Sequence, residues 1–196
     1  MKTVSENTKT AKRQFRSRMK ALLRNMDYGL RRQKSSSACE NLVRTQCFRD
    51  SAVVMMYLSI PYETDISEAI VHGFRQNKRV CVPRILSGSR DMEPVLIDSP
   101  EGLPFPQVSG LRNPCGGEVI SASEIDMIIT PGLGFDRNGN RLGRGGGFYD
   151  SFFLKNDRAV RCGFAFEQQM VEQIPVTDMD ICMDMLVTDS RVINCD

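Results

Sequence analysis

The residues best suited to chemistry lie in one glycine-rich segment, GNRLGRGGGFYD, which runs from Gly139 to Asp150. Glycine loses more conformational entropy on folding than any other residue, so a run of glycines indicates positive φ or close approach to a ligand. Arg141 and Arg144 add planar, permanently charged donors that match phosphate oxygens. The segment therefore predicts a loop that binds phosphate, and a plain structural loop is the alternative.

Three familiar loop types do not fit this segment. A P-loop needs a Gly-Lys pair, which the chain lacks. A dinucleotide-binding fingerprint needs a glycine where Phe148 stands. An EF-hand fits the oxygen ligands at 136–140 but fails at Arg141 and Gly147, which replace its glycine and its glutamate.

The composition excludes several other kinds of site. Seven cysteines without a Cys-x-x-Cys pair do not match zinc or thioredoxin spacings, and they indicate reduced thiols in a reducing compartment. The one histidine, His72, lies in a helical pattern, so a histidine-rich metal site is excluded. No apolar run approaches the roughly 18 residues of a membrane span. A chain of 196 residues with 41% hydrophobic residues predicts one soluble domain, residues 1–196.

Basic residues are concentrated at the N-terminus. Residues 1–34 hold eleven Lys and Arg against two acidic residues, although the net charge of the whole chain is +2. Such a segment could bind nucleic acid, act as a transit peptide, supply cations to an anionic site, or form a solvated rim.

The apolar residues of the same segment favour docking against the rest of the fold. They recur at helical spacing and predict a basic amphipathic helix over about residues 8–26, with a stripe formed by Ala11, Phe15, Met19, Leu22 and Met26. Lys12 and Arg16, four residues apart, project from one edge of that helix.

The rest of the chain alternates between strand and helix patterns. Strands are expected at 52–59, 79–83, 92–97, 126–132, 160–166, 185–188 and 191–194. Asp65 and Glu68 suggest a capping box at a helix start, Pro94 suggests a sheet edge, and 98–123 reads as a long irregular connection. The pattern predicts a single-domain three-layer α/β/α fold with a central mixed, largely parallel sheet. The glycine-rich loop follows a strand and precedes a helix-compatible segment, which is the arrangement that binds phosphates.

Four segments together resemble a known family. PGLGFDRNGNRLGRGGGFYD (131–150) is similar to the signature of the 5-formyltetrahydrofolate cyclo-ligases, also called 5,10-methenyltetrahydrofolate synthetases. KRQFR (12–16), YLSIPYETD (57–65) and DMLVTD (184–189) resemble the family's N-terminal helix, folate-binding turn and C-terminal segment. The resemblance implies an ATP- and Mg²⁺-dependent ligase. The formyl oxygen of 5-formyltetrahydrofolate is phosphorylated, N10 attacks, and 5,10-methenyltetrahydrofolate, ADP and phosphate are released.

The resemblance also implies residue roles. Arg144 and Arg141 would be catalytic, and Asp150 and Asp184 would hold Mg²⁺. The implied ATP-binding residues are Lys12, Arg13, Gln14, Phe15, Arg16, Arg141, Leu142, Gly143, Arg144, Gly145, Gly146, Gly147, Phe148 and Tyr149. The implied folate-binding residues are Leu58, Glu63, Arg144, Gly145, Gly146, Gly147, Phe148 and Tyr149. Gly146 stands where some members carry Lys, and Phe148 where many carry Tyr.

The implied partners are ATP and the folate, with no nucleic acid and no membrane. A monomer is expected, with a homodimer as the alternative. A cytoplasmic location is expected, with a mitochondrial one as the alternative from the Arg-rich N-terminus. Three other functions remain: a sugar-phosphate isomerase, a non-catalytic folate or nucleotide binder, and a nucleic-acid-binding protein that uses the basic arm.

Overall fold

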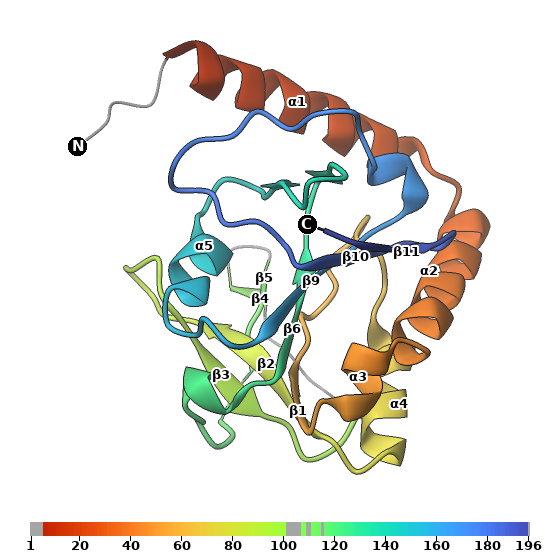
Figure 1. Ribbon diagram of the computed structural model, residues 1–196, viewed down its shortest axis with the longest axis vertical. Coiled ribbons are helices and arrows are strands. Elements are labelled where there is room, and N and C mark those ends of the chain that lie inside the picture. The colour runs from red at the N-terminus through yellow and green to blue at the C-terminus, as the bar shows by residue number, and fades with distance from the viewer. Residues whose placement is uncertain (1–5, 101–106, 109–110, 115, 196) are drawn as a thin grey trace.

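The computed structural model describes residues 6–100, 107–108, 111–114 and 116–195, arranged around one seven-stranded sheet (Figure 1). Its strands are β1 (Val53–Met55), β2 (Arg79–Ile85), β3 (Met92–Leu96), β6 (Met127–Pro131), β9 (Val160–Phe164), β10 (Met185–Val187) and β11 (Val192–Asn194). They lie in the order β11-β10-β9-β6-β1-β2-β3. The inner strands are parallel to one another, and only the two edge strands are antiparallel to their neighbours. The predicted mixed, largely parallel sheet is therefore confirmed.

Both faces of the sheet are covered, as buried parallel strands require. Successive residues of β1 point to opposite faces: Val54 joins one buried cluster, whereas Val53 and Met55 join the other. The first cluster packs under α2 (Tyr28–Val43), α3 (Gln46–Asp50) and α4 (Ser67–Arg75), and the second packs under the short helix α5 (Phe148–Phe153). Figure 1 shows these helices on the two sides of the sheet. The three-layer prediction is confirmed, with a thin layer on the α5 side.

The N-terminal helix α1 (Glu6–Asn25) lies across one end of the sheet and agrees with the predicted helix over about 8–26 (Figure 1). Met19 and Leu23 are buried against Leu133 and Phe166, which follow β6 and β9. The predicted stripe was wrong at Leu22, which is 37% exposed, whereas Leu23 is 2% exposed. Leu23 faces the cluster with Leu133 and Phe166, and Leu22, one residue round the helix, faces solvent.

Other expectations also need correction. Asp65 and Glu68 do not form a capping box: Ser67 N donates to Asp65 Oδ1 at 3.0 Å, Ser36 Oγ donates to Glu68 Oε2 at 2.8 Å, and the helix begins later than expected. The sequence did not predict α2, α3, or the hairpin of β7 (Gly134–Phe135) and β8 (Arg141–Leu142). Pro94 does lie on an edge strand, as expected.

The connection expected at 98–123 contains some regular structure. The structure describes β4 (Gln107–Val108), β5 (Leu111–Arg112) and the 3-10 turn η1 (Ala122–Glu124) there. Residues 101–106, 109–110 and 115 lie outside the described part of the chain.

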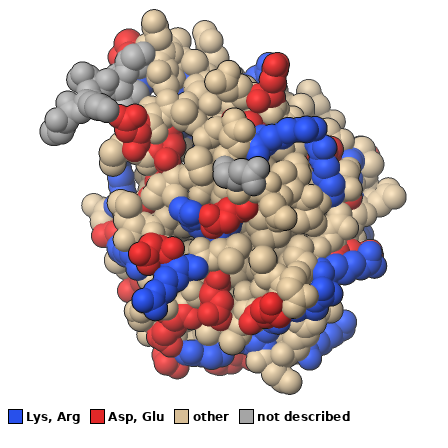
Figure 2. Space-filling model, in the orientation of Figure 1, with Lys and Arg blue, Asp and Glu red and all other residues tan. Residues whose placement is uncertain are grey.

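Three further observations concern membrane spans, thiols and surface charge. In the described segments, no helix has the length and apolar character needed to cross a membrane. Five cysteines of the same segments are free thiols: Cys39, Cys47, Cys81, Cys162 and Cys182. On the face shown in Figure 2, basic and acidic side chains are interspersed rather than separated.

Adjacent leucines of α1 provide a matched test of its docking. We expect Leu23→Ala to lower the free energy of unfolding by about 2–4 kcal/mol, because it leaves a cavity against Leu133 and Phe166. Leu22→Ala should change it by less than about 0.5 kcal/mol. Urea denaturation of both variants measures the difference. Equal losses would contradict the packing of α1 described above.

Candidate active site

A cavity of about 740 Å³ opens where β1 and β6 end. From β1 the chain continues to β2 on one side, and from β6 it continues to β9 on the other, so the strand order reverses between these neighbours. Ligands of open α/β sheets bind in the crevice at such a point, outside the carboxyl ends of the strands. Tyr57 and Leu58 after β1 line the cavity, as do Pro131 and Gly132 after β6.

The glycine-rich loop forms one wall of this cavity, and three of its glycines have backbone angles that favour glycine. Gly139 has φ +77°, Gly145 has φ +109° and Gly147, the residue before α5, has φ +74°. At Gly143 a Cβ would lie 2.9 Å from Arg141 Nη1, so the guanidinium would have to shift. The loop therefore requires glycine at the positions where its backbone has positive φ.

Arg141 is held beneath the loop, with its side chain only 5% exposed. Its Nη2 donates to both carboxylate oxygens of Asp150 at 3.2 Å, and its Nη1 donates to the Pro131 carbonyl at 3.4 Å. Its guanidinium lies 5.4 Å from the centre of the Tyr149 ring. The Arg141 Nε is buried and has no hydrogen-bond partner among the described residues, so one donor of this cation is unused.

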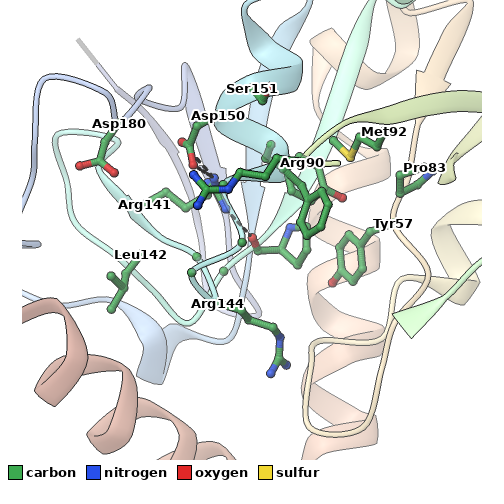
Figure 3. Close-up of a pocket in the computed structure, with 18 of the residues that line it drawn as sticks. Tyr57, Pro83, Arg90, Met92, Arg141, Leu142, Arg144, Asp150, Ser151 and Asp180 are labelled. Atoms are coloured by element: carbon green, nitrogen blue, oxygen red, sulfur yellow. Dashed lines mark hydrogen bonds and ion pairs between the residues drawn. The ribbon is translucent and has the colours of Figure 1, made fainter. Parts of the chain in front are cut away.

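Arg144 points away from Arg141 and Asp150 (Figure 3) and forms an ion pair across the cavity with Glu63. Its Nε lies 2.9 Å from Glu63 Oε1, and Ile60 N donates to the other carboxylate oxygen at 3.2 Å. The Glu63 side chain is 9% exposed and that of Arg144 is 37% exposed. Burial raises the pKa of Glu63 above its ordinary value, and the nearby Arg144 charge and Ile60 N–H oppose that shift.

Two tyrosines form neutral walls beside Glu63. Burial, reinforced by the Glu63 charge, raises the pKa of Tyr57 and of Tyr149 well above the ordinary tyrosine value. The Tyr57 hydroxyl donates to the Thr64 carbonyl within the same turn. Both phenols stay protonated at neutral pH, so the charges in this half of the cavity belong to Glu63 and the arginines.

Helix α1 contributes two cations to the cavity. Arg16 Nε donates to the Gly143 carbonyl at 3.0 Å, which fixes the helix against the glycine-rich loop. Lys12 is buried and pairs with Asp180, which also accepts from Thr177 N at 2.6 Å. Burial, which disfavours the Asp180 charge, is outweighed by Lys12 and Thr177, so the pKa of Asp180 is lowered.

The structure brings most of the predicted site residues together, but not all. Leu58, Glu63, Lys12, Arg16 and the residues from Arg141 to Asp150 line the cavity. Arg13, Gln14 and Phe15 do not line it: Arg13 and Gln14 are exposed, and Phe15 packs with the buried stripe of α1.

Asp184, the other residue of the predicted magnesium pair, is held by Arg161. It does not line the cavity, and its carboxylate accepts three hydrogen bonds from Arg161, from N at 2.7 Å, Nε at 3.0 Å and Nη2 at 2.5 Å. These donors neutralise its charge. In the described segments, no group of three or more His, Cys, Asp or Glu could hold a metal ion. Asp150 alone still suits Mg²⁺, which keeps several waters and takes its remaining ligands from substrate phosphates.

The cavity also has residues that the sequence did not single out. Arg90, from the turn between β2 and β3, and Asp180 both line it (Figure 3). Neither lies in a recognisable pattern: Arg90 sits in the polar turn SGSRD, and Asp180 lies in an irregular segment before β10. Only the three-dimensional arrangement places them.

Fold and site together define an α/β protein with a cation-lined cleft at the carboxyl ends of its parallel strands, closed on one side by a basic helix. The chain belongs to the 5-formyltetrahydrofolate cyclo-ligase family, whose model matches residues 8–189. The resemblance found in the sequence is therefore confirmed.

Relatives and solved structures agree with this assignment. The chain is 31% identical over 186 residues to the mouse 5-formyltetrahydrofolate cyclo-ligase, covering 89% of this chain and 92% of the mouse protein. It is also 31% identical to the Arabidopsis thaliana protein described as 5-formyltetrahydrofolate cyclo-ligase, mitochondrial, covering 93% of this chain and 75% of that one. The NMR structure of Aquifex aeolicus 5,10-methenyltetrahydrofolate synthetase matches with a TM-score of 0.81 at 27% identity, covering 93% and 92% of the two chains.

The raised pKa of Glu63 leads to a stability prediction. Folding favours the protonated form of Glu63 because its pKa is raised in the folded protein. Above the raised pKa the ionised carboxylate lowers the free energy of unfolding, and this loss disappears as the pH falls toward the ordinary value of 4.5. We expect Glu63→Gln to melt at the same temperature as the wild type or up to about 3 °C higher at pH 7.5. The difference should shrink at pH 4.5, as scanning calorimetry can measure.

Glu93→Gln is the matched control, because Glu93 also pairs with an arginine, Arg84, but on the more exposed sheet edge. It should show no gain at pH 7.5. A clear loss of melting temperature in Glu63→Gln at pH 7.5 would mean that the Arg144 pair outweighs the burial of Glu63.

Proposed function

We propose that this protein catalyses the ATP- and Mg²⁺-dependent cyclisation of 5-formyltetrahydrofolate to 5,10-methenyltetrahydrofolate, with release of ADP and phosphate. The observation that carries the proposal is the Arg144–Glu63 pair, which joins a glycine-rich cationic loop to a buried carboxylate inside one cavity. The reaction needs both parts, because a triphosphate and a pterin must meet. Family membership supports the same reaction.

Glu63 is suited to the pterin end of the substrate. The carboxylate is an acceptor-only group in a dry site, and the pterin ring offers N–H donors on one edge. Leu58 and the neutral rings of Tyr57 and Tyr149 supply apolar surface beside it. A pterin bound there replaces Arg144 as the partner of Glu63, and Arg144 is then free to contact phosphate.

The loop and α1 are suited to the triphosphate. Gly145, Gly146 and Gly147 line the cavity together with Arg16, Arg141 and Lys12, and glycine backbone N–H groups beside cations suit phosphate oxygens. Lys12 and Arg141 are each held by a carboxylate, Asp180 and Asp150 respectively. A triphosphate competes with these carboxylates for the two cations.

The reaction then depends on position and charge rather than on an acid–base histidine. The formyl oxygen attacks the γ-phosphorus, and the bond to the ADP oxygen breaks. N10 attacks the activated carbon, loses its proton, and inorganic phosphate leaves with the former formyl oxygen. Arg144 and Arg141 hold the reacting groups in line and balance the phosphate charge. Mg²⁺ bound beside Asp150 would supply further positive charge to the phosphate oxygens.

The first test is turnover itself. Purified protein with 5-formyltetrahydrofolate should develop the near-ultraviolet absorbance of the methenyl product only when ATP and Mg²⁺ are both present, with ADP formed in equal amount. We expect Arg144→Ala to lower kcat/KM by about 10²- to 10³-fold with the fold retained.

Arg137→Ala is its control, because Arg137 is exposed in the same segment and does not line the cavity. It should retain wild-type turnover. If the folded wild-type protein binds folate and ATP without turnover, it is a non-catalytic binder and the proposed function is wrong. Full activity in Arg144→Ala would remove that residue from the mechanism.

The two aspartates that the sequence pairs at a magnesium site should behave differently. We expect Asp150→Asn to raise the Mg²⁺ concentration for half-maximal activity about tenfold, because Asp150 lines the cavity. Asp184→Asn should instead lower the melting temperature with little effect on Mg²⁺ dependence, because its carboxylate holds Arg161. Magnesium titrations of turnover, paired with melting curves, measure both. The reverse pattern would place the metal at Asp184.

A further inference from the structure

The cavity holds more positive charge than its carboxylates compensate. Among the described residues, five Lys and Arg side chains and three Asp and Glu side chains line it. Four of these five cations have a partner: Lys12, Arg141 and Arg144 pair with the three carboxylates, and Arg16 donates to a backbone carbonyl. The fifth, Arg90, has neither an ion pair nor a hydrogen bond with any described residue. A ligand can therefore bind Arg90 without displacing an existing partner.

Arg90 reaches the cavity from the turn between β2 and β3. Pro83 of β2 and Met92 of β3 line the same wall of the cavity and give it apolar surface. Figure 3 shows the Arg90 side chain extending from this wall toward Arg141 and Asp150. Two arginines that face one cavity repel each other unless an anion lies between them, so this place suits a group of phosphate oxygens.

The position of this wall indicates which phosphate Arg90 would contact. Strand β2 pairs with β1, and the turn after β1 carries Leu58 and Glu63, which are assigned to the pterin. The cations Lys12 and Arg16, assigned to the triphosphate, come from α1 instead. Arg90 therefore extends from the folate side of the cavity toward the glycine-rich loop, where the formyl oxygen and the terminal phosphorus of ATP must meet.

We propose that Arg90 binds the phosphoryl group that passes from ATP to the folate, with its guanidinium donating to the phosphoryl oxygens. This rests on the proposed function, because the folate and the nucleotide together set where that group lies. During transfer the charge is spread over three oxygens of the phosphoryl group, and a planar guanidinium can donate to two of them at once. Arg90 contributes this charge from the wall that otherwise offers only apolar side chains.

The test compares Arg90→Gln and Arg90→Lys with the wild type. Arg90 is exposed, so both variants should fold. Arg84→Gln is the matched control, because Arg84 also lies on this sheet edge but does not line the cavity. It pairs instead with Glu93. Calorimetry with Mg²⁺ present gives the dissociation constants of ATP, ADP and 5-formyltetrahydrofolate, each measured without the other ligands.

We expect Arg90→Gln to raise the dissociation constant of ATP about 5- to 10-fold, while those of ADP and of the folate stay within about 2-fold of the wild-type values. Arg90→Lys should lie between wild type and Arg90→Gln, because lysine keeps the charge but loses the planar pair of donors. The control should match the wild type for all three ligands.

An unchanged dissociation constant of ATP in Arg90→Gln would overturn the assignment. An equal loss of ADP affinity, or weaker binding of the folate, would also overturn it, because Arg90 would then contact another part of the ligands. Failure of the proposed function is distinguishable: it would appear as wild-type protein that binds ATP and the folate without turnover, and the nucleotide affinities would still decide the role of Arg90. Wild-type protein that does not bind ATP would overturn both.

Discussion

The ion pair between Glu63 and Arg144 is the contact on which the site depends. It joins two segments 81 residues apart, the turn after β1 and the glycine-rich loop after β6. Burial raises the pKa of Glu63 and the Arg144 charge opposes that shift, so the pair offsets part of the cost of burying this carboxylate. The same contact places a cation of the phosphate-binding loop against the residue assigned to the pterin. In the proposed function, substrate replaces each of these two residues as the partner of the other.

The sheet explains why these segments meet. Because the strand order reverses between β1 and β6, the connections that follow them diverge and leave a crevice at the carboxyl edge. Helix α1 closes this crevice from outside, anchored by Met19 and Leu23 and by the bond from Arg16 to the Gly143 carbonyl. The basic residues at the N-terminus are thus attached to an anion-binding cleft through an apolar stripe. Without that stripe the basic residues would be solvated, which is one of the interpretations that the composition of the segment allows.

Local patterns in the sequence predicted a large part of this structure. The strands, the mixed sheet and α1 followed from periodicity and turn residues, because such patterns depend on neighbours along the chain. The glycine-rich loop was predicted because Gly145 and Gly147 need their backbone conformation whatever the rest of the fold does. The hairpin of β7 and β8 was missed, since strands of two residues carry too little pattern. Helix α2 was missed because its few buried residues, such as Ala38 and Leu42, lie in a mainly polar segment.

Contacts between residues that lie far apart in the sequence could not be predicted from it. Lys12 and Asp180 are 168 residues apart, and no spacing rule connects them. Asp184 matches the family's pattern in sequence, yet Arg161 takes its carboxylate in the folded chain.

The central claim is that the cavity brings the formyl oxygen of the folate to the γ-phosphorus of ATP. The most direct test uses 5-formyltetrahydrofolate labelled with ¹⁸O in the formyl group, turned over with unlabelled ATP in unlabelled water. The account predicts that the inorganic phosphate released carries one ¹⁸O atom per product formed, as mass spectrometry of the phosphate would show. Unlabelled phosphate, with the ¹⁸O recovered in water, would mean that the oxygen leaves without being phosphorylated and would contradict the account.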